Sequence, residues 1–309
     1  MEVREIEGAP GLAPLYAKAV VTSLPLPLIG GGDGELPDNG LTLPDVEVDR
    51  EHLADYSHVC GFRLSDQLPV TYPQVLSFPL AMRLMTDREF PFPLLGLVHI
   101  VNRIEQRRPI GTDEPLTLAV RAENLRPHDK GRQVDLVTDV LVDGEQVLTG
   151  TATYLHRGGG SSEGANDERA DEGSSASGSG GSGDGKPGEV PEQELRRAAT
   201  WKVPGHIGRA YAAVSGDRNP IHMHSLTARL FGFPSAIAHG MWMKARCLAA
   251  FEGRLPDALE TEVAFKKPML LPARVHFSTG RAPGGGHAFA LHDARKGAHH
   301  LTGWVRPLG

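Results

Sequence analysis

The sequence predicts an α+β fold made of two similar units, in each of which an antiparallel sheet wraps one central helix. An internal repeat, an apolar helical segment in each half and a run of alternating strands after each segment support this prediction. A chain of 309 residues is long enough for two such units, each with its own core. We expect units at 1–157 and 196–309, a linker at 158–195, and two sheets joined into one.

The internal repeat is clearest around a tyrosine motif. Residues 56–62 read YSHVCGF and residues 211–217 read YAAVSGD, so tyrosine and glycine recur at the same spacing. Two further pairs extend the alignment by eye: 77–80 with 238–241, and 107–110 with 266–269. The second of these pairs shares two basic residues, a proline and an apolar residue.

In the first unit, the pattern predicts a short strand at 46–48 and a helix at 50–60. An apolar helix is expected at 76–85, interrupted near Pro79, because proline cannot continue the hydrogen-bonding ladder. The strands that follow, some with clear alternation, are expected at 95–108, 115–125, 133–143 and 146–156.

In the second unit, Asn219 and Pro220 are a strong signal for the start of a helix, and Gly232 is a suitable stop. Between them, Ile221, Leu226 and Leu230 fit one helical face. The expected helices are 206–216, 220–231 and a central helix at 240–252. The expected strands are 260–268, 273–282, 286–293 and 298–306.

The segment between the units is rich in Gly, Ser, Asp and Glu and has almost no large apolar residues. It cannot bury enough surface to offset the entropy of ordering, so we expect a flexible tether. The net charge of −6, without a basic block, gives no indication of nucleic-acid binding. Cys60 and Cys247 lack metal-site spacing and indicate buried thiols in a reducing compartment.

An apolar run at 19–29 is broken by Pro25 and Pro27 and follows an acidic segment. This pattern argues against a signal peptide or a membrane span, and we expect a cytoplasmic protein.

Asp217 and His222 are the main candidates for catalysis. Asp217 is expected in the loop that enters a helix, and His222 in its first turn. Their side chains can therefore converge on one small molecule, near backbone N–H groups that favour developing negative charge.

This stretch resembles the hydratase motif of MaoC-like dehydratases, a hotdog-fold family that includes R-specific enoyl-thioester hydratases. The resemblance continues in residues 238–241, AHGM, where the family's long central helix begins with a glycine. It implies a double hotdog with a degenerate first repeat and a catalytic second one. The family often has Asp or Asn two residues after the catalytic histidine, whereas this chain has His224.

The resemblance implies a lyase of fatty acid metabolism: a (3R)-hydroxyacyl-thioester dehydratase, or the same enzyme acting as an enoyl hydratase. Asp217 and His222 would hold the water and move protons, Asn219 would position Asp217 or the water, and the Gly240 N–H would bind the thioester oxygen. No cofactor and no metal is implied. The substrate would be an acyl-CoA or acyl carrier protein thioester, with a medium to long chain. The residues expected to bind it are Tyr211, Ser215, Gly216, His239, Met241 and Lys267.

The first copy is expected to have lost this chemistry. In the alignment, Phe62 stands for Asp217, Gln67 for His222 and Pro79 for Gly240, and proline has no N–H to donate. We therefore interpret the first unit as a scaffold.

Other readings remain open. His222, His224 and His239 could indicate a metal site, but residues two apart on a helix face different ways. The basic residues before Pro109 and Pro268, Lys267 among them, could bind CoA phosphates. His299 and His300 are expected at a solvated strand end. The competing functions are a hotdog thioesterase and a non-catalytic acyl-binding subunit; a homodimer is compatible with each.

Overall fold

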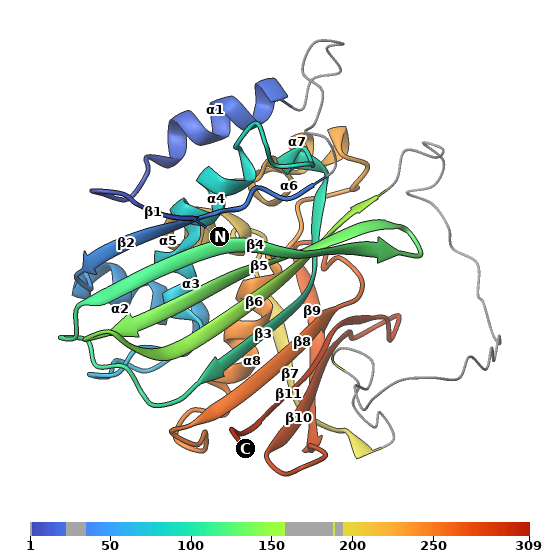
Figure 1. Ribbon diagram of the computed structural model, residues 1–309. Coiled ribbons are helices and arrows are strands. Elements are labelled where there is room, and N and C mark those ends of the chain that lie inside the picture. The colour runs from blue at the N-terminus through green and yellow to red at the C-terminus, as the bar shows by residue number, and fades with distance from the viewer. Residues whose placement is uncertain (1, 23–34, 158–187, 189–193) are drawn as a thin grey trace, which may run out of the picture.

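The computed structural model describes residues 2–22, 35–157, 188 and 194–309, and its strands form one 11-stranded sheet (Figure 1). The first half, residues 2–157, contributes β1 (Glu2–Glu5), β2 (Asn39–Val46), β3 (Leu97–Gln106), β4 (Leu116–His128), β5 (Gly131–Val142) and β6 (Glu145–Arg157). The second half, residues 194–309, contributes β7 (Arg196–Val203), β8 (Leu259–Phe265), β9 (Ala273–Arg281), β10 (His287–Asp293) and β11 (His299–Pro307).

The strand order is β1-β2-β4-β5-β6-β3-β8-β11-β10-β9-β7, so β3 and β8 form the seam between the halves. They pair antiparallel, from Val101 opposite Ala264 to Gln106 opposite Leu259. Across this seam, Arg103 donates a hydrogen bond to Glu260 at 2.8 Å. The sheet is antiparallel except for the pairing of β1 with β2. The predicted α+β double hotdog with one continuous sheet is confirmed.

The helices of the first half are α1 (Leu12–Thr22), α2 (Arg50–Cys60), α3 (Tyr72–Leu76) and α4 (Phe78–Met85). Those of the second half are α5 (Ile207–Ser215), α6 (Pro220–Met223), α7 (Ser225–Leu230) and α8 (Gly240–Ala249). A single 3-10 turn precedes β3 at Leu94–Gly96. None of the helices in the described part of the chain is long and apolar enough to cross a membrane.

The central helix of the second half is α8, whose apolar side chains lie in the core. In the first half its place is taken by α3 and α4, which meet at Ser77. Pro79 lies in the first turn of α4, which explains the break, because a proline cannot donate to the preceding turn.

The backbone corrects part of the repeat alignment. Gln67 forms an isolated bridge with Gly111, and Ile237 forms one with Leu270. The next residues repeat the match, since Leu68 N–H donates to Ile110 O and Ala238 N–H to Met269 O. Gln67 is therefore the counterpart of Ile237 and not of His222. Counting on from this register, the counterpart of Gly240 is Val70 and not Pro79.

The match of Phe62 with Asp217 agrees with the structure. Each residue follows a glycine in the left-handed region, Gly61 at φ +81° after α2 and Gly216 at φ +74° after α5. From there the halves diverge, because 62–67 is a short loop whereas 217–237 contains α6 and α7. His222 therefore has no counterpart in the first half.

Several other expectations need correction. The strand predicted at 46–48 lies at 39–46, and the helix predicted at 220–231 divides into α6 and α7 because His224 is extended between them. His300 is buried, with 6% of its surface exposed, and is not at a solvated strand end. Sequence reasoning missed β1, α1 and β7. Nearly all of the predicted linker, 158–187 and 189–193, lies outside the described residues.

Candidate active site

The loop that carries Asp217 is built by the end of α5. Gly216 adopts a left-handed conformation and donates its N–H to Ala212 O, which closes the helix and turns the chain sharply. Asp217 then donates its own N–H to Ser215 Oγ at 3.2 Å, and its carboxylate accepts the Asn219 N–H at 3.2 Å. These bonds fix the carboxylate at the mouth of the loop, where 33% of the side chain is exposed.

His222 is placed by the next helix. Asn219 Oδ1 accepts the Ile221 N–H at 3.4 Å, so the asparagine side chain caps α6, as Asn-Pro predicts. His222 Nδ1 lies 2.8 Å from Ile237 O and donates to it, which leaves Nε2 as the basic nitrogen. A Cβ at Gly208 would lie only 2.2 Å from His222 O. Glycine is therefore required there for α5 and α6 to approach this closely.

His239 completes a group of three side chains. Its Nε2 lies 2.9 Å from Asp217 O, and its ring stacks on that of His222 with centroids 3.7 Å apart. One ligand atom from each of Asp217, His222 and His239 lies within 4.8 Å of the others. Among the described residues, these three could hold a metal ion. His224, the other histidine considered for such a site, is exposed and outside the group.

The electrostatics favour one protonation state. Burial lowers the pKa of His239 to about 3, with the neighbouring His222 as a second cause, and burial also lowers the pKa of His222. Burial by itself raises the pKa of Asp217, but His239, His222, the Asn219 N–H and a tyrosine hydroxyl together hold it below its usual value. At neutral pH the site therefore contains one carboxylate and two neutral imidazoles.

The tyrosine is Tyr16, which sequence reasoning missed. It projects from α1, and its hydroxyl lies 3.1 Å from Gly216 O and 3.3 Å from Asp217 Oδ1, while accepting the Arg218 N–H at 2.7 Å. Burial and the nearby Asp217 charge raise the pKa of Tyr16, so the hydroxyl stays protonated and can donate. No motif around residue 16 signals this role, because the contact spans 200 positions or more.

The first half supplies a second wall. His99 on β3 stacks on Tyr154 of β6 with centroids 4.7 Å apart, and Phe265 of β8 meets the His99 ring edge-on at 4.9 Å. Burial is the main cause that raises the pKa of Tyr154 and lowers that of His99 to about 4, and the Asp217 charge acts on both. His99 Nε2 is buried and has no hydrogen-bond partner among the described residues. An unpaired ring nitrogen of the first half therefore lies within electrostatic reach of Asp217.

Gly240 begins α8 after His239, whose side chain does not cap the helix. Among the described residues, no hydrogen bond uses the Gly240 N–H. A Cβ at this position would lie 3.0 Å from the Phe265 ring, so the aromatic side chain packs directly over the glycine. The helix N-terminus thus presents a free donor beside the three-residue group.

The remaining predicted binding residues divide into two groups. Tyr211 is buried with its ring 5.0 Å from His239, and Ser215 and Gly216 form the Asp217 turn already described. Met241, in the first turn of α8, packs on the core. Lys267 is exposed, and its described contacts are backbone hydrogen bonds with His299 and His300. The structure thus does not bring its side chain to the group.

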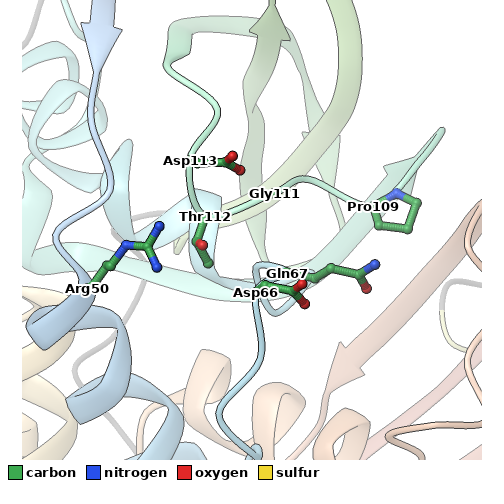
Figure 2. Close-up of a pocket in the computed structure, with 7 residues that line it drawn as sticks. All are labelled: Arg50, Asp66, Gln67, Pro109, Gly111, Thr112 and Asp113. Carbon is green, nitrogen blue, oxygen red and sulfur yellow. The ribbon is translucent and has the colours of Figure 1, made fainter.

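A pocket of about 330 Å³ lies in the first half (Figure 2). Its lining residues come from the start of α2, the 62–67 loop and the segment after β3, and they are Arg50, Asp66, Gln67, Pro109, Gly111, Thr112 and Asp113. It contains none of the three clustered side chains. It lies where the first half has a short loop in place of α6 and α7.

Comparison with known proteins agrees with this geometry. A MaoC-like domain model matches residues 184–284, which include the whole Asp217–Gly240 region. The chain is 38% identical over 283 residues to 3-hydroxyacyl-thioester dehydratase X of Mycobacterium tuberculosis, with 92% of this chain and 94% of that protein covered.

Solved structures extend the comparison. The crystal structure of HtdX from Mycobacterium tuberculosis matches with a TM-score of 0.72 and 37% identity, covering 87% of this chain and 100% of the other. A MaoC-like dehydratase from Phytophthora capsici, at 17% identity and a TM-score of 0.66 over 87% of this chain and 95% of the other, shows the fold alone. The chain thus belongs to the MaoC-like dehydratase family and is a carbon–oxygen lyase, a thioester dehydratase or hydratase.

Proposed function

We propose that the protein interconverts (3R)-3-hydroxyacyl and trans-2-enoyl thioesters, with Asp217 and His222 as the groups that move protons. The observation that carries this proposal is the placement of an ionised carboxylate and a neutral imidazole within 4.8 Å of each other, beside an unused helix N–H. Dehydration of a 3-hydroxyacyl thioester needs two groups that move protons and one donor to the thioester oxygen, and it has no redox step.

In dehydration, a base removes the proton from the α-carbon and the bond between the β-carbon and the hydroxyl oxygen breaks. The departing oxygen takes a proton and leaves as water, so the products are the enoyl thioester and water. Hydration is the reverse. We assign these transfers jointly to Asp217 and to Nε2 of His222, which is free because Nδ1 donates to Ile237 O. General acid–base groups of this kind contribute on the order of 10² to 10⁴ each.

Removal of the α-proton places negative charge on the thioester oxygen. The Gly240 N–H, at the positive end of the α8 dipole, is our candidate donor to that oxygen. One such donor contributes about 10² to 10³ in rate. Asn219 acts in this arrangement through its backbone, since its N–H orients the Asp217 carboxylate while its side chain caps α6.

One experiment separates the proposed reaction from thioester hydrolysis. With an enoyl-CoA substrate, loss of the conjugated enoyl absorbance and release of free thiol are measured side by side. We expect the absorbance to fall without thiol release, because a hydratase leaves the thioester intact. Thiol release in step with substrate loss would identify a thioesterase, and neither signal would support a non-catalytic acyl-binding subunit.

We also propose that the acyl chain is of medium or long length. The Phe78 ring at the start of α4 lies beside Gly216, since a Cβ on that glycine would be 3.5 Å from Phe78 Cδ1. The apolar face of α4 therefore begins at the catalytic loop and leads into the first half.

We expect kcat/KM to rise from four-carbon to longer acyl thioesters. Each buried methylene can contribute up to about 0.8 kcal/mol, or roughly fourfold, until the cavity ends. Initial rates with a series of saturated-tail enoyl-CoA substrates test this. A profile that peaks at four carbons would contradict it.

A further inference from the structure

Helix α7 exposes an unusual amount of apolar surface. Leu226 is 75% exposed, Leu230 83% and Phe231 40%. Leu226 and Leu230 are four residues apart and share one helical face, whereas Ala228 faces the interior and is fully buried. The leucines that predicted a helix from their spacing thus face away from the core. Contiguous apolar residues with a polar rim are typical of interaction sites.

The rim of this surface is basic. Residues 205–235, from just before α5 to the loop after α7, contain three arginines and one carboxylate, Asp217, in a chain whose acidic residues outnumber Lys and Arg by 38 to 32. Arg209, Arg218 and Arg229 are exposed. The described side-chain contacts of Arg209 and Arg229 are with the carbonyl oxygens of Met223 and Pro234, and none of the three arginines pairs with a described carboxylate.

The surface lies next to the catalytic group. Helix α6, which holds His222, packs against α7, and Figure 1 shows the two short helices side by side. Asp217 keeps a third of its side chain exposed, so the site opens to solvent next to the exposed Arg218. A carrier seated on α7 would stand beside this opening.

We propose that Leu226, Arg229, Leu230 and Phe231, here called the α7 surface, dock an acidic acyl carrier protein that delivers the thioester. This inference rests on the proposed function and names the carrier. A carrier helix with carboxylates around an apolar residue matches both the arginines and the leucines of the α7 surface. The phosphates of CoA would use the positive charge but leave the leucines without a partner.

A second copy of this chain fits the surface less well. In a two-fold symmetric contact the same patch meets itself, so the arginines of one copy would face a surface with the same positive charge. Like charges at an interface oppose association. The acidic carrier is therefore the occupant that the charge pattern favours.

The test compares two carriers of one acyl chain. The substrates are a 3-hydroxyoctanoyl group on CoA and the same group on the acyl carrier protein of the source organism. The variants are Leu230→Glu and Arg229→Glu, and the matched control is Leu64→Glu, since Leu64 is a 77% exposed leucine in the first half. We expect both α7 variants to lower kcat/KM for the carrier-protein substrate at least tenfold, mainly through KM, with CoA turnover changed less than twofold.

The control should leave both substrates unchanged, and added salt should weaken only the carrier-protein reaction. Equal losses with both substrates, or no loss with either, would overturn the docking proposal. A dimer that becomes monomeric in Leu230→Glu would overturn it in favour of a contact between copies. Failure of the wild-type protein to turn over the CoA substrate would instead be a failure of the proposed function.

Discussion

The two halves of the molecule have the same arrangement of a helix that ends at a glycine, and they differ after that glycine. Helices α2 and α5 pack on each other, with the rings of Tyr56 and Tyr211 6.3 Å apart, and each ends at a left-handed glycine. After Gly61 the chain continues with Phe62 and a short loop to Gln67. After Gly216 it continues with Asp217, α6 and α7 before reaching Ile237. The proposed chemistry thus lies in a segment that one half has and the other lacks.

The first half is nevertheless part of the site. It supplies the Tyr16 hydroxyl to the Asp217 loop and the aromatic wall of His99 and Tyr154. It also helps hold α8, because the buried Lys244 Nζ donates across the seam to Asn102 Oδ1 at 2.6 Å, besides donating to Thr261 O of β8 at 3.3 Å. The first half lacks the segment that carries α6 and α7, but it is not a separate cover.

The comparison predicts the largest loss of turnover when residues unique to the second half are substituted. Asp217→Ala and His222→Ala should each lower turnover of an enoyl thioester by at least about 10², because each removes a group that we propose transfers protons. Steady-state kinetics measures this, with circular dichroism to verify folding. Phe62→Ala at the equivalent position is the control and should alter stability while kcat stays near normal. Near-normal turnover in either catalytic variant would remove that residue from the mechanism.

A smaller loss is expected for Tyr16→Phe, which tests whether the first half positions the carboxylate. A hydrogen bond to a charged group contributes about 1.5–3 kcal/mol. Because the Tyr16 bond to Asp217 is long, at 3.3 Å, we expect the lower end of this range, so kcat should fall roughly tenfold with little change in KM. The Tyr16 hydroxyl also lowers the pKa of Asp217, so its removal should shift the acid limb of the pH profile upward.

Tyr72→Phe is the matched control for Tyr16, because the Tyr72 hydroxyl is bonded to His52 Nδ1 at 2.8 Å within the first half. It should leave kcat and the pH profile unchanged. If Tyr16→Phe behaves like this control, Tyr16 has only a structural role.

The pH dependence of the wild type follows from the same site. In the proposed mechanism the reacting form has ionised Asp217 and neutral His222, and both pKa values are lowered. As the pH falls, kcat/KM should therefore stay constant through the ordinary histidine pKa of about 6.5 and decline only below it. A decline that begins above that pH would contradict the lowered pKa of His222, and with it the neutral imidazole that we place in the site at neutral pH.

The pH measurement needs a control for unfolding at low pH. The folded-state pKa of His239 is lowered to about 3, so the unfolded chain binds a proton first as the pH drops. The stability contributed by burying the neutral ring is present above the unfolded pKa and is lost as the pH falls from about 6.5 toward that value. Activity after return to neutral pH separates unfolding from titration of the site.

Sequence analysis predicted well the elements that depend on local signals, such as the start of a helix. Helix α2 has the expected bounds, Arg50–Cys60, and Asn219 with Pro220 starts α6. These signals placed Asp217 and His222 near each other. They could not reveal Tyr16, because the position of α1 depends on packing against residues 200 positions away.

The alignment of Gln67 and of 77–80 failed for a physical reason, whereas that of 107–110 with 266–269 agrees with the bonds to Ile110 and Met269. The alignment by eye matched 77–80 with 238–241, whereas the register is set by the backbone bonds of Leu68 and Ala238 to the neighbouring segments. Strand β7 was missed because it is an edge strand with mostly exposed residues and no strong alternation. Edge strands need fewer apolar residues, so hydrophobic periodicity detects them poorly.

The smallest effect is predicted for Gln67→Ala, and it sharpens the comparison most directly. If Gln67 were the counterpart of His222, its loss could impair the chemical step. In the structure it corresponds to Ile237 and lines an open pocket with Asp66 and Arg50 (Figure 2), away from the clustered side chains. Because Gln67 is exposed and its N–H bond to Ser65 Oγ does not involve the side chain, stability should change by less than about 0.5 kcal/mol. Turnover at saturating substrate should equal that of the wild type, and a tenfold loss would mean that the first half still takes part in catalysis.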